Sequence, residues 1–127
     1  MDTKTFLVWI VAAVCLCGCS GNAPESVKSA EALAKRLIPA QASRIEFREI
    51  PSDSTDVFEL CSEGRKIVIS ANNAGTMAVG LNYYLNNYCK TTVSEYAAHP
   101  VEMPETLPSV PEKVRVTARV PWRFYLN

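Results

Sequence analysis

Residues 57–89 decide the fold, and they read VFELCSEGRKIVISANNAGTMAVGLNYYLNNYC. Two β-rich runs, 57–61 and 65–71, lie on either side of Gly64, which can supply the positive φ that a tight hairpin turn needs. Apolar residues alternate along the second run, so one face of this strand is expected to be buried, and Val68 adds burial on the other face. The apolar face comprises Ile67, Ile69 and Ala71. A β-hairpin is therefore predicted at the centre of the domain.

A helix is predicted directly after the hairpin. Asn72 and Asn73 can each cap its start, and the apolar side chains that follow recur at the i, i+3, i+4, i+7 spacing of a helix. The stripe comprises Met77, Ala78, Leu81, Tyr84, Leu85, Tyr88 and Cys89. We expect this stripe to pack on the hairpin.

Gly75 and Gly80 in this helix have the spacing of a phosphate-binding loop. Leu81 and Asn82, however, stand where such a loop needs a lysine and a hydroxyl residue, so a bound phosphate would not be neutralised. We expect the two glycines instead to let the helix approach the sheet closely.

Upstream of the hairpin, the pattern predicts a first helix and a first strand. Asn22 with Glu25 resembles a capping box, Pro24 suits a first turn, and apolar residues recur at helical spacing until Pro39. These residues are Val27, Ala30, Leu33, Ala34, Leu37 and Ile38. Residues 44–50 then alternate, which predicts a strand.

Downstream of the second helix, residues 91–96 predict a short strand, and prolines then dominate the chain. Pro100, Pro104, Pro108 and Pro111 favour an extended, stiff segment, so residues 99–113 are predicted to be a linker. Residues 114–120 alternate again and predict a new strand. The last six residues contain three aromatic side chains, Trp122, Phe124 and Tyr125, which either fold back on the domain or begin a second one.

The predicted fold class is therefore α/β (α+β), a small sheet of about four strands with two helices packed on it. A hairpin lies in the middle and an extended proline-rich segment follows. The expected organisation is a leader over 1–18, a tether over 19–23, the α/β domain over 24–98, the linker over 99–113 and the start of a following domain over 114–127.

The leader has the pattern of a bacterial lipoprotein signal peptide. Lys4 precedes an apolar run, 6–17, and Leu16, Gly18 and Cys19 complete a lipoprotein cleavage motif. Cleavage is expected between Gly18 and Cys19, with lipid on the thiol of Cys19 as the membrane partner. The run is shorter than the roughly 20 residues of a spanning helix, which argues against a permanent transmembrane segment. The alternative is an ordinary secretory leader.

The charge balance and the cysteine content limit which partners and crosslinks are expected. Thirteen basic and thirteen acidic residues cancel, and no basic stripe indicates nucleic-acid binding. Cys61 and Cys89 remain after the leader in a compartment where disulfides can persist, so pairing is permitted, although two buried thiols are favoured over a bridge.

No catalytic, cofactor or metal site is predicted. Glu46 and Glu49 are three residues apart on a strand, hence on opposite faces, and cannot act as a carboxylate pair. Asp53 and Asp56 lie in a polar loop where turn formation explains them. His99 is the only histidine and has no partner at metal-ligand spacing.

The chain resembles the N-terminal domain of α-N-acetylglucosaminidases, glycoside hydrolase family 89, in three segments that follow in the same order. These segments are residues 65–70, the helix over 74–89 with Gly80 to Leu85, and the last residues, 122–127. The resemblance implies that a (β/α)₈ barrel follows, with two glutamates that remove terminal α-linked N-acetylglucosamine with retention of configuration. A retaining mechanism needs carboxyl groups about 5 Å apart, and neither has a counterpart in this chain.

The resemblance also implies roles for the two ends of the chain. Residues 123–127 would form the first barrel strand, and Asn127 would reach the edge of the substrate pocket. The chain is thus expected to be the non-catalytic beginning of an exported, lipid-anchored glycosidase at the cell envelope, facing the periplasm or the exterior. Its partners would be the barrel and, through the barrel, a glycan. The alternative is a self-contained, lipid-anchored carbohydrate-binding or interaction module.

Overall fold

The structure, a computed structural model, describes residues 22–51, 54–94, 96 and 101–119. The elements in chain order are helix α2 (Glu25–Leu37), the short 3₁₀ helix η1 (Ala42–Arg44), strands β1 (Ile45–Glu49), β2 (Val57–Glu63) and β3 (Lys66–Ala71), helix α3 (Ala74–Asn87) and strand β4 (Val114–Thr117). None of the described helices is long and apolar enough to cross a bilayer.

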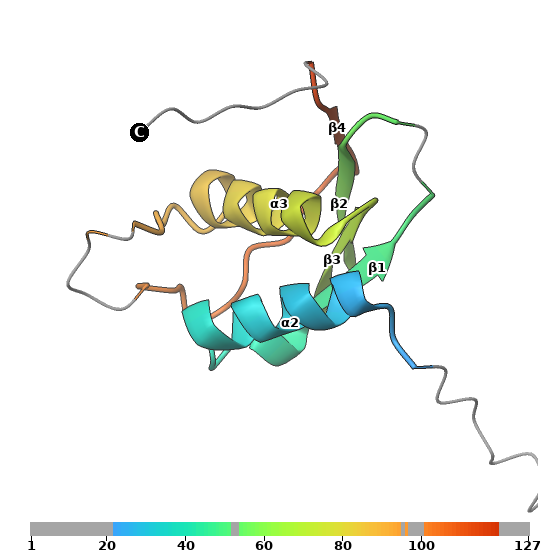
Figure 1. Ribbon diagram of the computed structural model, residues 1–127. Coiled ribbons are helices and arrows are strands. Elements are labelled where there is room, and N and C mark those ends of the chain that lie inside the picture. The colour runs from blue at the N-terminus through green and yellow to red at the C-terminus, as the bar shows by residue number, and fades with distance from the viewer. Residues whose placement is uncertain (1–21, 52–53, 95, 97–100, 120–127) are drawn as a thin grey trace, which may run out of the picture.

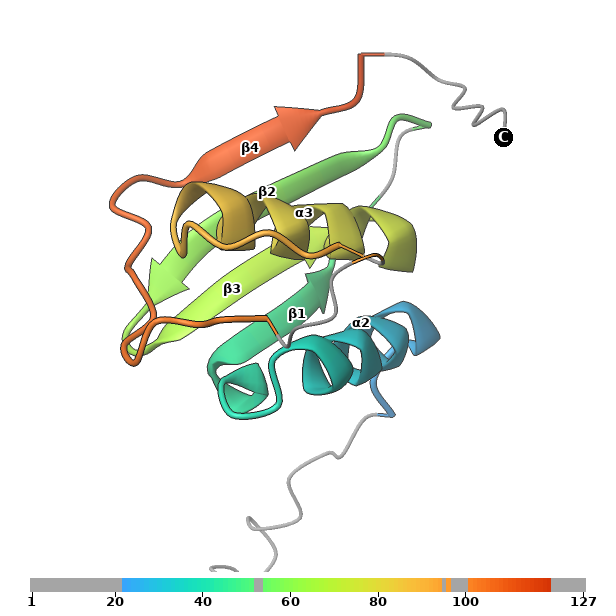
Figure 2. The same ribbon diagram turned by 90° about the vertical axis from the view of Figure 1, so that its left-hand side faces the viewer.

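The four strands form one mixed sheet in the order β1-β3-β2-β4 (Figure 2). β2 is antiparallel to both of its neighbours, whereas β1 runs parallel to β3. Both helices pack side by side on one face of the sheet, and no described helix covers the other face (Figure 1). The predicted fold class, a four-stranded sheet with two helices, is confirmed.

The central hairpin is confirmed in detail. Gly64 has a φ of +60° at the turn, and Glu63 faces Lys66 in the register of β2 and β3. The residues of β3 expected on the core face are buried, and so is Val68 on the opposite face. These core-facing residues are Ile67, Ile69 and Ala71.

The helix caps show one correct and one incorrect prediction. Asn73 caps α3, since its side chain accepts a hydrogen bond from the amide of Thr76 at 2.8 Å. The prediction of a capping box formed by Asn22 and Glu25 is wrong. Pro24 occupies the N-cap of α2, and no side chain forms a capping hydrogen bond there. Asn22 lies two residues before that position, too early in the chain to cap the helix.

The fourth strand is not where the pattern placed it. Residues 91–94 form no strand, because the chain after α3 is held by the helix end: Lys90 has a φ of +56°, and the amide of Thr91 donates to the carbonyl of Leu85 at 3.0 Å. The fourth strand is instead β4, which pairs antiparallel with β2 and aligns Val116 with Phe58.

Residues 101–113, named here the strap, pack on the domain and are not a free linker. Leu107 and Val110 are buried in the core. The hydroxyl of Tyr84 donates to the carbonyl of Pro108 at 2.7 Å, and the amide of Val110 donates to Ser62 Oγ at 2.8 Å. The strap passes the hairpin end of the sheet and leads into β4 (Figure 2). Residues 114–117, which the pattern assigned to a following domain, thus belong to this sheet, because β2 offers them a free edge.

Candidate functional site

Several residues singled out from the sequence lie outside the described residues. They are Gly18 and Cys19 of the expected cleavage and lipidation site, Asp53, His99 and Asn127. Within the described ranges, no group of three or more histidine, cysteine, aspartate or glutamate residues is arranged to hold a metal ion. Three surfaces of the described part of the chain are candidate functional features.

The first surface is the open face of the sheet, where charged side chains form a cross-strand network. Arg48 on β1 donates to both carboxylate oxygens of Glu63 on β2, at 2.8 and 2.7 Å, and to Glu46 at 2.8 Å. Lys66 on β3 donates to the other oxygen of Glu46 at 3.0 Å. The network lies on the same face as Val68, whose side chain is buried although no helix covers it.

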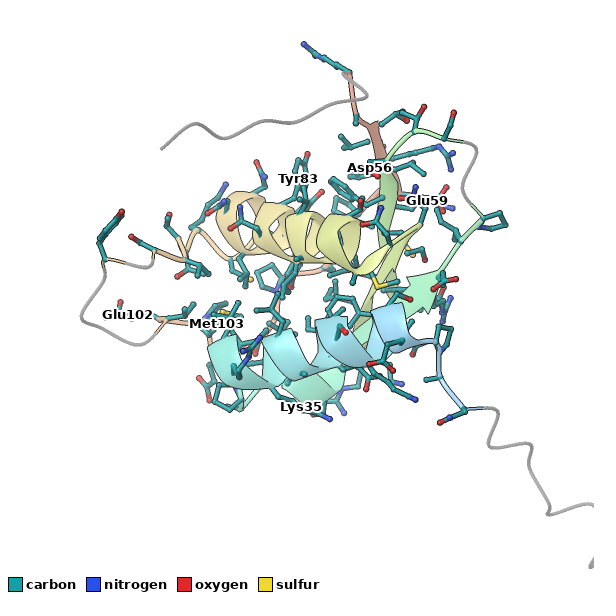
Figure 3. The ribbon with its side chains drawn as sticks, in the orientation of Figure 1. Lys35, Asp56, Glu59, Tyr83, Glu102 and Met103 are labelled. Atoms are coloured by element: carbon teal, nitrogen blue, oxygen red, sulfur yellow. The ribbon has the colours of Figure 1, made fainter. Side chains whose placement is uncertain are left out.

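A second ion-pair group holds β4 to β2 on this face. Glu59 contacts Lys113 at 2.6 Å and also pairs with Arg115, its register partner in β4. Its side chain is only 16% exposed and points away from the helices (Figure 3). Hydrogen bonds from Lys113 and then Arg115 lower the pKa of Glu59.

The second surface is a ledge beside α3, formed by Val79 and Tyr83 of α3 and by Val114 and Val116 of β4. The ring of Tyr83 packs on Phe58 with centroids 5.4 Å apart. Phe58 is the register partner of Val116, so β4 lies beside the ring that Tyr83 covers. Figure 3 shows Tyr83 on the side of α3 that faces away from α2. We call these four residues the α3–β4 ledge.

The third surface is an apolar groove between the two helices, with a volume of about 350 Å³. Leu33 and Leu37 of α2 line one side, and Leu81 and Leu85 of α3 line the other. The groove thus lies on the opposite side of α3 from the ledge.

Comparison with known proteins decides the family. The model of the α-N-acetylglucosaminidase (NAGLU) N-terminal domain matches residues 28–109, well over half of the chain. The chain belongs to this family. The match begins within α2 and ends within the strap at residue 109, so it includes most of α2, the hairpin, α3 and the hydrogen bond between Tyr84 and Pro108. No match was found among curated proteins.

The α-N-acetylglucosaminidase N-terminal domain is also similar to part of several solved structures of a family 89 glycoside hydrolase from Clostridium perfringens. The complex with 2-acetamido-1,2-dideoxynojirmycin is 32% identical, with a TM-score of 0.69. The complex with PUGNAc is 34% identical, with a TM-score of 0.68. A variant with two Glu→Gln substitutions, in complex with its substrate GlcNAc-α-1,4-galactose, is 34% identical, with a TM-score of 0.67. Each similarity covers 74% of this chain and 11% of the solved one.

The charged network of this α-N-acetylglucosaminidase N-terminal domain braces the sheet. Hydrogen bonds from Lys66 and then Arg48 lower the pKa of Glu46, and Arg48 lowers the pKa of Glu63. A glycosidase general acid needs the opposite, a raised pKa that keeps its proton near neutral pH. The guanidinium of Arg48 also lies between the two carboxylates, in the space that a scissile bond would need.

The other acidic residues have structural contacts. Glu49 accepts a hydrogen bond from Ser26 of α2, so it lies on the helix side of β1 while Glu46 lies on the open side, as predicted. Asp56 accepts from the side-chain amide of Asn73 at 2.8 Å, which links the loop before β2 to the cap of α3.

Both cysteines of the α-N-acetylglucosaminidase N-terminal domain are free, half-buried thiols. Cys61 is the register partner of Val68 on β3, whereas Cys89 follows α3 and packs against the core. Burial raises the pKa of Cys89, which keeps this thiol protonated. Neither the network nor the ledge was expected from the sequence, although the alternation of charges in β1 was a signal for the network.

Proposed function

We propose that this chain is the non-catalytic N-terminal domain of a lipid-anchored, exported glycoside hydrolase that removes terminal α-linked N-acetylglucosamine. The observation that carries the proposal is the family match over residues 28–109, in a chain that corresponds to 11% of the family 89 enzymes it is similar to. In this account the domain supports a barrel that performs the chemistry.

The state of the carboxylates supports the non-catalytic role. Glu46, Glu59 and Glu63 each accept hydrogen bonds from basic side chains, and each has a lowered pKa. They are therefore ionised and engaged in pairs that join different strands of the sheet. Such carboxylates stabilise a sheet and are poorly suited to donate a proton to a leaving sugar.

The substrate class follows from the relatives. The Clostridium perfringens enzyme has GlcNAc-α-1,4-galactose as its substrate. In the proposed protein a terminal α-linked N-acetylglucosamine would be bound and cleaved by the following barrel, so this domain meets the glycan only through that barrel.

The reading frame downstream of the Asn127 codon tests the proposal. We expect it to encode a (β/α)₈ barrel with two glutamates at the carboxyl ends of its strands. A stop codon directly after Asn127, with no barrel encoded next to it, would contradict the proposal.

Cys19 is proposed to carry the lipid that holds the enzyme at the cell envelope. Cells fed an alkyne fatty acid should label the wild-type protein and lose that label in Cys19→Ser. Cys17→Ser, two residues earlier in the same leader, is the matched control and should label as the wild type does. Equal labelling of the two variants would refute the anchor and leave the glycosidase assignment untouched.

A further inference from the structure

We infer that the α3–β4 ledge, formed by Val79, Tyr83, Val114 and Val116, is the surface on which the following domain of the same protein docks. This inference rests on the proposed function, since it requires that a domain follows. The expected occupant is an apolar patch on the outside of that domain, surrounded by polar residues.

The ledge is apolar and partly uncovered. Val79 is 44% exposed and Val116 is 37% exposed, and they are two of the three exposed large hydrophobic residues in the described ranges. Val79 and Tyr83 are four residues apart on α3, so their side chains share one face of the helix. Exposed apolar residues that gather on adjacent elements indicate an interaction site, whereas scattered ones do not.

The arrangement of the layers explains why the ledge exists. α3 packs on β2 and β3, and α2 packs on β1, so neither helix contributes a major contact to β4. The helix side of β4 therefore forms a step beside α3, with the buried ring of Phe58 at its base. β4 is also an edge strand, which proteins commonly cover.

The other two surfaces are less suited to docking. On the open sheet face, Val57 and Val68 are already buried, and the carboxylates of the network are paired, so docking there would remove paired charges from water. The groove is apolar, but it lies between α2 and α3, on the far side of α3 from β4.

The path of the chain favours the ledge as well. β4 ends at Thr117, and the first strand of the following domain is expected from Arg123. The five residues 118–122 span at most about 17 Å when fully extended. The next domain therefore begins close to the carboxyl end of β4, the strand that supplies half of the ledge.

Thiol labelling of the full-length protein tests the inference. Four single variants form two matched pairs: Val79→Cys with Asn82→Cys on α3, and Val116→Cys with Arg115→Cys on β4. Asn82 is exposed on α3, where it lines the groove between the helices, and Arg115 is exposed on the opposite face of β4 from Val116. Peptide mass spectrometry after a timed maleimide pulse separates each new thiol from Cys61 and Cys89.

We expect Val79→Cys and Val116→Cys to react at least about tenfold more slowly than their controls, because docked surface is protected from reagent. Any other ranking would overturn the inference, including slow reaction at Arg115→Cys with fast reaction at Val116→Cys, which would place docking on the open face. Hydrolysis of an aryl α-N-acetylglucosaminide by the same preparations reports separately on the proposed function. Full activity with equal labelling rates would refute the ledge alone.

Discussion

At the scale of single residues, Gly80 shows how closely α3 approaches the sheet. A Cβ at this position would lie 2.8 Å from Ile69 Cγ2 and 3.3 Å from Phe58 Cδ2. The expectation that glycine permits close approach is thus confirmed for Gly80. At Gly75 the nearest atom to a Cβ is the side chain of Asn73, which belongs to the helix cap, so this glycine serves no approach to the sheet.

Gly80→Ala is predicted to lower the free energy of unfolding by about 1–2 kcal/mol. The overpacking cost of about 1–3 kcal/mol is partly offset by the better helix propensity of alanine, worth up to about 1 kcal/mol. Urea unfolding measures the change. Asn82→Ala, at an exposed position of the same helix, is the control and should stay within about 0.5 kcal/mol of the wild type. A Gly80→Ala variant as stable as the control would disprove the close packing.

Glu59 gives the domain a predictable response to acid. Its pKa is lowered in the folded state from the ordinary value of 4.5, so its ion pairs stabilise the fold above that pH and lose their effect as the pH falls through the folded pKa. Glu59→Gln should lower stability by about 1 kcal/mol or less at pH 7, and the difference should shrink as the pH falls below 4.5 and through the lowered folded pKa.

Thermal unfolding across this pH range measures the effect of Glu59→Gln. Glu105→Gln provides the control, because Glu105 is exposed in the strap and makes no ion pair within the described ranges. Its melting temperature should follow that of the wild type at every pH. A difference for Glu59→Gln that stayed constant as the pH fell below 4.5 would mean that lost packing, not lost charge, was responsible.

At the scale of elements, the sequence was informative wherever one segment carried its own pattern. Alternation in β1 and β3 and the helical stripes of α2 and α3 predicted these elements, because each buries one face against a neighbour. The turn at Gly64 was equally local. These features need no knowledge of distant residues.

The strand at β4 was predicted correctly, but the packing of the strap and the sheet to which β4 belongs were misjudged, because both depend on distant partners. Prolines favour an extended chain, and residues 101–113 form no helix or strand, but composition does not reveal that Leu107 and Val110 reach the core. β4 forms by pairing with β2, more than 50 residues earlier in the chain. The ledge and the ion-pair network depend on the same registers, so neither could be derived from local pattern.

Tyr84→Phe tests the strap as an element. The substitution removes the hydroxyl that binds the Pro108 carbonyl, and we expect it to cost about 0.5–1.5 kcal/mol, the usual net contribution of a hydrogen bond, because this carbonyl is only partly buried. Hydrogen exchange at the Val110 amide should also speed up, since the strap loses its tie to α3. Tyr83→Phe is the control, because that hydroxyl makes no hydrogen bond with any described residue. Equal effects of the two variants would argue against the tie.

At the scale of the whole molecule, the domain connects a proposed lipid anchor at one end to a proposed barrel at the other. α2 begins at Glu25, six residues after Cys19, so the first helix would stand close to the membrane. β4 is the last of the described strands, and it lies across α3 from α2 (Figure 1). The barrel would then be held on the side of the domain away from its first helix.

We propose that hydrolysis belongs to the domain that follows and not to these 127 residues. The most direct measurement compares turnover of an aryl α-N-acetylglucosaminide by the full-length protein and by the 127-residue chain at equal molar concentration. We predict release of the aryl group by the full-length protein and none above buffer by the 127-residue chain. Turnover by the 127-residue chain, or a full-length protein that leaves the substrate intact, would contradict the account.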